Sequence, residues 1–290
     1  FYVDSTPTHS YMKYLYKYPQ AAYPYDDIVA TNARRGRHEL EYELLDTGVF
    51  DGNRYFDVTV EYAKASPEDI LVRITIDNRG PEAAALHVLP TLWFRNTWSW
   101  SADALRPSLR QMEDGSTIAA RHHDLDEFYL HATGAPTLLF TENETNYERL
   151  FSKPDRTPYV KDAFHNYLVH RRGNAVNPAK TGTKAAAHYT VSVPAQSSSV
   201  LRLRLSDVAI AGHDPAEFDA VVNARREEAD EFYAGIVPAS AGADAANVMR
   251  QALAGMMWTK QFYNYDVDRW LEERGSSPFK TRHNAAPRND

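Results

Sequence analysis

Apolar and polar side chains alternate along much of the first two thirds of the chain, as they do in strands with one face in a core. In Arg54 to Ala63 apolar residues recur at every second position, and Ile70 to Ile76 repeats this period. The turn-forming Asn78–Pro81 follows, so residues 84–94 are expected to return as the next strand of a hairpin. The other expected strands are residues 117–121, 127–132, 137–141, 185–193 and 198–205.

Beyond about residue 207 the apolar period becomes that of a helix. Asp214, Pro215 and Glu217 have the residue types of a helix start with a capping box. The apolar stripe of this helix is expected to consist of Phe218, Val221, Val222, Ala229, Phe232 and Tyr233. A second helix is expected from Asp244 to Tyr263. Its apolar side would consist of Val248, Met249, Ala252, Met256, Thr259 and Tyr263.

Many short strands without helices between them favour an antiparallel β-sandwich over a doubly wound parallel sheet. We therefore expect a mainly β fold, with a sandwich domain in residues 1–210 and helices in residues 211–290. In the aromatic N-terminal region, a short helix is expected from Ser10 to Tyr18, ended by Pro19. The polar stretch Thr31 to Glu43 is expected to be a solvated loop or edge.

The amino-acid composition argues against several classes of binding partner and site. The 32 Lys and Arg residues against 39 Asp and Glu give a net charge of −7, which argues against nucleic acid or an anionic membrane as the main partner. No run of about 18 apolar residues is present, so no segment is expected to span a bilayer. The absence of cysteine excludes disulfides and thiolate metal sites and favours a reducing, cytoplasmic location. Because the chain starts at Phe1 and ends in the polar tail Ser276–Asp290, we expect it to be a piece of a longer protein.

The histidines do not predict a metal site, and no cofactor is expected. His122 and His123 are adjacent, and neighbouring side chains of a strand point to opposite faces. His165 and His170 are five residues apart, which is not the helical spacing of a zinc motif. Gly182–Lys184 has the start of a phosphate-loop pattern without its other glycine, and we interpret it as a turn.

One segment is rich in tryptophan. Three of the five tryptophans lie between Trp93 and Trp100, beside Arg95 and Asn96. Indole faces stack on the C–H face of a sugar ring, and guanidinium or amide groups bind its hydroxyls. The alternative is that Trp93, Trp98 and Trp100 fill the seam between the sandwich and the helices, and both interpretations stay open.

Several longer strings resemble a known group of enzymes. They are VDSTPTHSYMK (3–13), LYKYPQ (15–20), ELLDTG (43–48), WFRNTW (93–98), FTENETN (140–146), KDAFH (161–165) and RQALAGM (250–256). In these strings the chain is similar to bacterial and fungal proteins usually called glucosidases. Those proteins are related to glycoside hydrolase family 63 and to mannosylglycerate-hydrolase-like enzymes.

The resemblance implies an N-terminal β-sandwich, or super-sandwich, followed by linker helices and an (α/α) barrel. It implies inverting hydrolysis of α-glucosides or related glycosides, in which a carboxylic acid protonates the leaving oxygen and a carboxylate activates water. Both catalytic groups are expected on the barrel beyond Asp290, so no residue here is given a catalytic role and residues 1–290 alone are expected to be inactive. The expected partners are a carbohydrate substrate and the remainder of the catalytic domain.

Two groups of residues are candidates for substrate binding. The first is the tryptophan segment, with Trp93, Arg95, Asn96, Trp98 and Trp100. The second is a pair of expected loops that would reach over the barrel mouth, with Tyr14, Lys17, Tyr18, Gln20, Lys161, Asp162 and His165. The alternatives are that the second group holds domain interfaces, and that the sandwich is a non-catalytic carbohydrate-binding or structural module.

Overall fold

A computed structural model describes residues 1–100, 103–209, 212, 214–259 and 266–275. The contacts within the chain divide it into two compact units, Phe1–Met257 and Trp258–Asp290. The second unit contains one described helix, α6 (Val267–Glu273), and everything below concerns the first unit. The domain boundary expected near residue 210 stays a prediction.

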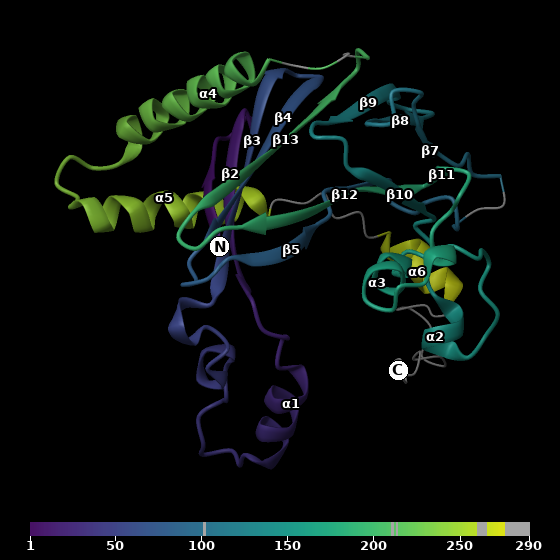
Figure 1. The fold of residues 1–290 in the computed structure, drawn as a ribbon, viewed down its shortest axis with the longest axis horizontal. Coiled ribbons are helices and arrows are strands. Elements are labelled where there is room, and N and C mark those ends of the chain that lie inside the picture. Colours follow the sequence, from purple (N-terminus) through teal and green to yellow (C-terminus); the bar gives the residue numbers. More distant parts are fainter. Residues whose placement is uncertain (101–102, 210–211, 213, 260–265, 276–290) are drawn as a thin grey trace. The chain divides into compact units, whose positions relative to one another are not determined.

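The first unit is built on a large antiparallel sheet of nine strands (Figure 1). The order of the strands across this sheet is β1 (Tyr2–Ser5), β2 (Tyr11–Pro19), β3 (Tyr55–Ser66), β4 (Asp69–Asn78), β13 (Ser198–Ser206), β9 (Asp126–Ala132), β8 (Thr117–His122), β7 (Ser108–Gln111) and β11 (Thr181–Gly182). The long β2, β3 and β4 pair in register along most of their length.

A smaller antiparallel sheet packs against the large one. Its central strand β12 (Lys184–Val193) pairs with β10 (Thr137–Thr141), β5 (Ala84–Val88) and β6 (Thr91–Trp93). The inward-facing side chains of both sheets form one core, which includes Phe56, Ile76, Leu138, Phe140 and Leu203. The fold is therefore the expected antiparallel sandwich followed by helices, because the period-2 pattern buries one face of each long strand.

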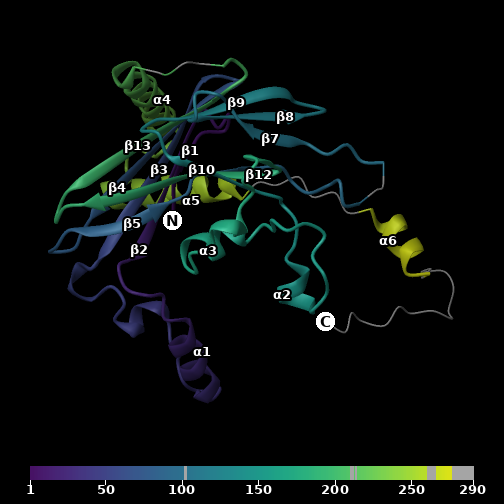
Figure 2. The ribbon, with the colours of Figure 1, turned by 45° about the vertical axis from the view of Figure 1, so that its right-hand side comes forward.

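Helix α4 (Pro215–Ile236) covers part of the outer face of the large sheet, and Figure 2 shows it beside these strands. Its Phe218 and Val222 are buried against Tyr11 and Leu71 of the sheet. The expected N-terminus is confirmed, since the Asp214 carboxylate accepts a hydrogen bond from the Ala216 N–H at 2.9 Å. Helix α5 (Ala243–Trp258) follows.

The apolar side expected for α5 is wrong over its described length. Ala254 is the buried residue of this helix, whereas Val248 and Met256 are 60% and 72% exposed. The end of the expected helix, residues 260–263, lies outside the described residues. No helix in the described part of the chain has the length and apolar character needed to cross a membrane.

Three other expectations about elements are wrong. Residues 10–18 are not a helix but most of β2, because pairing with β3 along nine residues outweighs local helix preference. The expected loop at 31–43 begins inside a helix, α1 (Tyr25–Arg34). The segment after Asn78 does not form a hairpin with β4 but crosses into the smaller sheet. The Asn78 amide directs this crossing, since it donates to the Glu82 carbonyl at 2.8 Å and to the Val193 carbonyl at 2.9 Å.

The smaller helices lie near the candidate site. These are α2 (Tyr147–Phe151), α3 (Ala163–Leu168) and the short 3-10 turn η3 (Gly173–Ala175). Phe164 of α3 packs with Leu139, Ala186 and Val176 on the outer face of the smaller sheet. This contact fixes α3 on the rigid sandwich, so side chains on α3 and in the loops around it have a defined position.

Candidate functional site

The tryptophan segment leaves β6 as an ordered loop. Trp93 ends the strand and is 56% exposed, and Trp100 is 63% exposed. The Arg95 guanidinium lies 5.3 Å from the centre of the Trp100 ring. These two indoles are therefore largely exposed in the first unit, although Arg95 lies over one face of Trp100.

Trp98 has a different environment from its neighbours. It is half-buried, and its indole N–H donates a 2.7 Å hydrogen bond to the Glu144 carboxylate, which is buried. The Arg106 guanidinium lies 5.8 Å from the centre of the indole. The hydrogen bond from the indole N–H to Glu144 therefore fixes the tryptophan loop on the segment that follows β10.

Asn96 and Asn143 strengthen the same connection. The Asn96 amide donates to the Asn143 carbonyl at 3.0 Å, and the Asn143 amide donates to the Phe94 carbonyl at 2.9 Å. Asn143 is part of the FTENETN string, whose role the sequence left unassigned. The structure shows that this string is the scaffold on which the tryptophan loop is mounted.

The Lys161–His165 segment joins the opposite side of this scaffold. The Lys161 N–H donates to the Glu144 carbonyl at 2.9 Å. The Asp162 carboxylate accepts from the Asn146 amide at 3.1 Å and from Arg149 at 3.0 Å. Three strings that are distant in sequence thus converge, and we call residues 94–100, 142–149 and 161–166 together the loop cluster.

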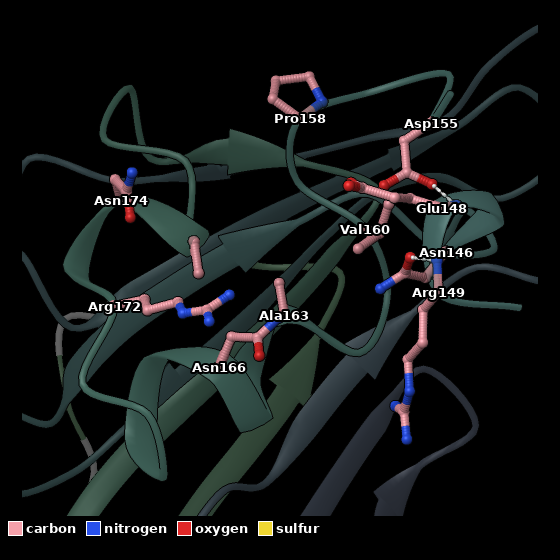
Figure 3. Close-up of a pocket in the computed structure, with 11 residues that line it drawn as sticks. Asn146, Glu148, Arg149, Asp155, Pro158, Val160, Ala163, Asn166, Arg172 and Asn174 are labelled. Carbon is pink, nitrogen blue, oxygen red and sulfur yellow. Dashed lines mark hydrogen bonds between the residues drawn. The ribbon is translucent and has the colours of Figure 1, made fainter. Parts of the chain in front are cut away.

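A cavity of about 600 Å³ opens beside the loop cluster (Figure 3). We call it the polar pocket, because amide, guanidinium and carboxylate groups dominate its lining. The lining residues are Asn146, Glu148, Arg149, Asp155, Pro158, Val160, Ala163, Asn166, Arg172, Asn174 and Ala175. Its volume is in the range of ligand pockets and well above that of one monosaccharide.

Some polar groups of the pocket are already used by the fold. The Asn146 side-chain oxygen accepts the Arg149 N–H at 2.9 Å and caps α2. The Asp155 carboxylate accepts the backbone N–H groups of Tyr147 at 2.5 Å and Glu148 at 3.0 Å. These two side chains shape the wall of the pocket. Both bonds of Asp155 go to its Oδ1, so its second carboxylate oxygen can still accept from a ligand.

Other groups of the pocket remain available. Among the residues that the structure describes, the side chains of Asn166 and Arg172 make no hydrogen bond to protein. Their backbones are joined, since the Arg172 N–H donates to the Asn166 carbonyl at 3.0 Å. Figure 3 shows the Arg172 guanidinium directed into the pocket, with Asn166 beside it, whereas Arg149 points away. A ligand with several hydroxyl or other oxygen groups could satisfy both side chains.

A smaller cavity of about 160 Å³ shares Arg149 and Asn166 with the polar pocket. Asp162, His165 and His170 complete its lining. The imidazole rings of His165 and His170 meet edge to face with their centres 5.1 Å apart. Two of the expected site residues, Asp162 and His165, therefore lie next to the polar pocket.

Lys184 supports the segment that contains Lys161 and Phe164. Its ammonium donates to the Lys161 carbonyl at 2.7 Å and lies 5.1 Å from the centre of the Phe164 ring. Burial and repulsion from Lys161 lower the pKa of Lys184, and Asp162 partly offsets them. The sequence did not predict Asn166 or Arg172 as site residues, because each belongs to a polar stretch without a recognisable motif.

Of the residues expected from the N-terminal region, Tyr14, Lys17 and Tyr18 lie on strand β2, and Gln20 directly follows it. Lys17 pairs with Asp57 at 2.7 Å, and the hydrogen bond to Asp57 raises the pKa of Lys17. The Gln20 amide donates to the Asn78 side-chain oxygen at 2.7 Å. Tyr18 is exposed, with its ring 6.1 Å from that of Tyr16. The structure does not bring Lys17, Tyr18 or Gln20 to the loop cluster.

Tyr14 lines a different cavity together with Trp93. This cavity, of about 440 Å³, lies between the two sheets and is mainly apolar. The Tyr14 ring centre is 6.4 Å from that of Tyr62, and burial raises the pKa of Tyr14 to about 12. Because its lining offers few polar groups, this cavity is poorly suited to a sugar.

The expectation that His122 and His123 point to opposite faces is wrong. Strand β8 ends at His122, so His123 lies in the turn and its ring stacks on that of His122 at 4.3 Å. The nitrogens of both, with the Asp124 carboxylate, lie within 4.8 Å of one another. However, His122 Nδ1 already accepts the Asp124 N–H at 3.1 Å, which counts against chelation by this group.

Comparisons with known proteins give one clear sequence relative. The chain is 36% identical to "Uncharacterized protein YMR196W" of Saccharomyces cerevisiae over 316 aligned positions. The alignment covers 93% of this chain and 29% of that protein, so the chain spans less than a third of its relative's length. No family model matches the chain.

Solved structures give partial likenesses. A polysaccharide lyase, BACCELL_00875, matches 59% of this chain and 22% of its own, with a TM-score of 0.32 and 14% identity. A putative kojibiose phosphorylase from the human microbiome matches 69% of this chain and 21% of its own, with a TM-score of 0.31 and 6% identity. Likenesses at this level do not establish a common fold.

Proposed function

We propose that this chain is the β-sandwich part of a glycoside hydrolase and that the loop cluster and polar pocket bind its carbohydrate. The finer proposal is an inverting glucosidase acting on α-glucosides or related glycosides, in which an (α/α) barrel follows the helices. The observation that carries the proposal is the convergence of three strings of the resemblance beside one polar pocket. A sandwich that served only as a brace would not need such a pocket.

The chemistry of the pocket supports a neutral, hydroxyl-rich ligand. Sugar hydroxyls both donate and accept hydrogen bonds, and planar amide and guanidinium groups match them in pairs. Asn166 supplies both a donor and an acceptor, and Arg172 supplies donors. The exposed faces of Trp93 and Trp100 belong to the same loop cluster and its flanking strand, where stacking on a sugar ring is possible.

The carboxylates around the loop cluster do not support catalysis by this chain alone. Glu142 accepts from Arg106 at 2.7 Å and from the Thr183 hydroxyl at 2.6 Å. Glu144 accepts from Trp98, and Asp162 accepts from Arg149. Inverting hydrolysis needs one carboxyl group as a proton donor and another that faces a water molecule. These three serve as acceptors for the fold. Following the resemblance, we place the acid and the base on the barrel, outside residues 1–290.

Calorimetric titration of the chain with maltose-type oligosaccharides tests carbohydrate binding. We expect wild-type protein to bind and Arg172→Ala and Asn166→Ala each to weaken binding by about five- to tenfold, the value of a lost hydrogen bond of about 1–1.5 kcal/mol. Lys17→Ala is the matched control, because Lys17 is equally polar but lies away from the pocket, and its affinity should equal that of wild type.

Two results would contradict the proposal. If wild-type protein produces no heat with any of the oligosaccharides, carbohydrate binding by this chain is wrong. If Arg172→Ala and Asn166→Ala both bind as wild type does, the polar pocket is not the binding site.

A structural module is the second candidate function. Its support is the Trp98–Glu144 hydrogen bond, which shows that part of the tryptophan segment stabilises the fold. A purely structural role predicts that substitutions in the loop cluster change stability and leave oligosaccharide affinity unchanged.

A further inference from the structure

Two imidazoles meet on the outer face of the smaller sheet. His87 lies on β5 and His188 on the neighbouring β12, and their side chains point away from the core that Leu86, Ala187 and Tyr189 enter. His87 Nδ1 lies 2.9 Å from His188 Nε2, and the ring centres are 5.0 Å apart. His87 is exposed and His188 is half-buried, so a dissolved ion can reach both nitrogens.

We propose that His87 and His188 form a chelating site for a divalent transition metal ion. Metal–imidazole bonds are about 2.0–2.1 Å long, so two nitrogens bound at a right angle lie about 2.9 Å apart. A tetrahedral angle would separate them by about 3.3 Å. The observed 2.9 Å equals the right-angle value of Cu²⁺ and Ni²⁺ sites, but here it is the length of a hydrogen bond, so the two rings must turn for both lone pairs to point at one ion. Zn²⁺ would require the nitrogens to move slightly further apart as well.

The hydrogen bond between His87 and His188 is compatible with metal binding by two neutral imidazoles. In the hydrogen bond between the rings one nitrogen donates its proton and the other accepts it. When a metal replaces the shared proton, the donor ring carries its proton on its other nitrogen and offers a lone pair. No oxidant or further reactant is needed, and the net proton count of the two rings does not change.

The strands position the two ligands before any ion arrives. β5 and β12 pair continuously from Val88–Tyr189 to Ala84–Val193, and His87 is directly opposite Thr190. The Thr190 hydroxyl lies 3.3 Å from His87 Nδ1 and can orient that ring or supply an oxygen nearby. A backbone already fixed by the sheet lowers the entropy cost of bringing two ligands together.

The other histidine pairs in the described part of the chain are less suitable. His122 Nδ1 accepts the Asp124 N–H, and His123 and Asp124 lie in the turn after β8 and not on paired strands. His165 and His170 meet edge to face with ring centres 5.1 Å apart; His165 lies on α3 and His170 follows it, so neither is on paired strands. The cross-strand pair alone combines a short nitrogen separation with a rigid support.

Titration of the metal-free chain at pH 7.5 tests the site. After dialysis against EDTA, CuSO₄, NiCl₂ and ZnCl₂ are added separately in a calorimeter, and the melting temperature is measured with and without NiCl₂. We expect wild-type protein to bind one ion at this site and to melt at a higher temperature in its presence, because an ion that binds only the folded state stabilises it. His87→Ala and His188→Ala should lose both effects.

His123→Ala is the matched control, since it removes an exposed histidine from the other cluster and should bind as wild type does. His87→Asn serves as a second variant, and circular dichroism checks that each variant is folded. Absence of binding by wild type would overturn the proposal. Binding that persists in both His87→Ala and His188→Ala, or that is lost only in His123→Ala, would overturn it as well.

Discussion

At the scale of single residues, existing hydrogen bonds decide which side chains of the candidate site can meet a ligand. Trp98 and Asn96 have residue types suited to sugar binding, but their polar atoms are bound to Glu144 and Asn143. Asn166 and Arg172 attracted no attention in the sequence, yet their side chains have hydrogen-bonding capacity left in the described structure. We therefore expect Trp98 and Asn96 of the loop cluster to stabilise the fold, and Asn166 and Arg172 of the polar pocket to bind the ligand.

The Trp98–Glu144 bond gives a prediction about stability. Trp98→Phe keeps an aromatic ring but leaves the buried Glu144 carboxylate without this donor. We expect the free energy of unfolding to fall by about 1–3 kcal/mol, measured by urea denaturation. Trp93→Phe is the control, because Trp93 is exposed, and it should change stability little. Equal stability of Trp98→Phe and wild type would show that this bond contributes nothing to the fold.

At the scale of elements, a charged network holds α4 on the large sheet. Arg73 of β4 pairs with Glu61 of β3 at 2.8 Å and with Asp219 of α4 at 3.4 Å. Asp219 also pairs with Arg202 of β13 at 2.5 Å, and Glu61 accepts from the Tyr11 hydroxyl at 2.7 Å. Two guanidinium groups of the sheet thus fix one carboxylate of the helix, beside the apolar contact made by Phe218.

This network predicts a loss of stability in acid. Burial alone would raise the pKa of Glu61, but the hydrogen bonds from Arg73 and Tyr11 outweigh it and keep the pKa below its usual value. The hydrogen bond from Arg202 likewise lowers the pKa of Asp219. A lowered folded-state pKa means that the stabilisation is complete above the unfolded-state value, about 4.5 for Glu61, and is lost as the pH falls through the folded-state value.

Urea denaturation of wild type and Glu61→Gln between pH 7 and pH 3 measures this effect. At pH 7 we expect the variant to be less stable by about 3 kcal/mol, since one partner of a buried ion pair is removed. The difference should begin to shrink below about pH 4.5, where Glu61 of the unfolded chain becomes protonated, and should be smallest once the pH is below the lower folded-state pKa. Glu82→Gln, at an exposed ion pair with Arg54, is the control and should behave as wild type. A difference that is constant with pH would contradict the assignment.

Ion pairs of Arg250 hold α5 against α4 and β1. Its guanidinium pairs with Asp230 of α4 at 2.7 Å and with the buried Asp4 of β1, and lies 4.6 Å from the centre of the Tyr233 ring. We expect Arg250→Met to speed amide hydrogen exchange throughout α5 while leaving the sheet protected, as mass spectrometry can show. Arg250→Lys keeps the charge and should give a smaller effect. Unchanged exchange in α5 would mean that apolar contacts alone hold this helix.

At the scale of the whole molecule, the proposed function separates binding from catalysis. The sandwich carries the loop cluster and polar pocket, whereas the acid and base are proposed to lie on a barrel outside this chain. The sequence relative is more than three times as long as the segment aligned here, so a longer protein of this kind has room for such a domain.

The separation predicts that residues 1–290 do not hydrolyse α-glucosides. Release of glucose from maltose-type oligosaccharides by the purified chain should equal the rate without protein, while a longer protein that includes the barrel should be active. A variant of the longer protein with Arg172→Ala should show weaker substrate binding with intact folding. Hydrolysis by residues 1–290 themselves would place the acid and base within this chain and contradict the proposal.

The sequence by itself determined the elements whose patterns are local. The strands β3 and β4 and the start of α4 at Asp214 are confirmed, because a face packed on the core leaves its mark at every second or every third to fourth residue. The second face of β3, expected in water, is instead buried at Asp57 and Glu61. Elements that depend on pairing between distant parts of the chain could not be predicted from a local pattern. Residues 10–18 became β2 only through β3, and the segment after Asn78 changed sheet because a side-chain amide ties it to the end of β12.

Only the tertiary structure decided the composition of the candidate site. It joined the tryptophan segment, the FTENETN string and the Lys161–His165 segment through hydrogen bonds between residues about 15 to 50 positions apart. It also placed Lys17 and Gln20 elsewhere and brought His87 within 2.9 Å of His188, 101 residues away. Sequence patterns record which residues are buried along one element, whereas a site depends on the spacing between elements, which is set by the packing of the folded chain.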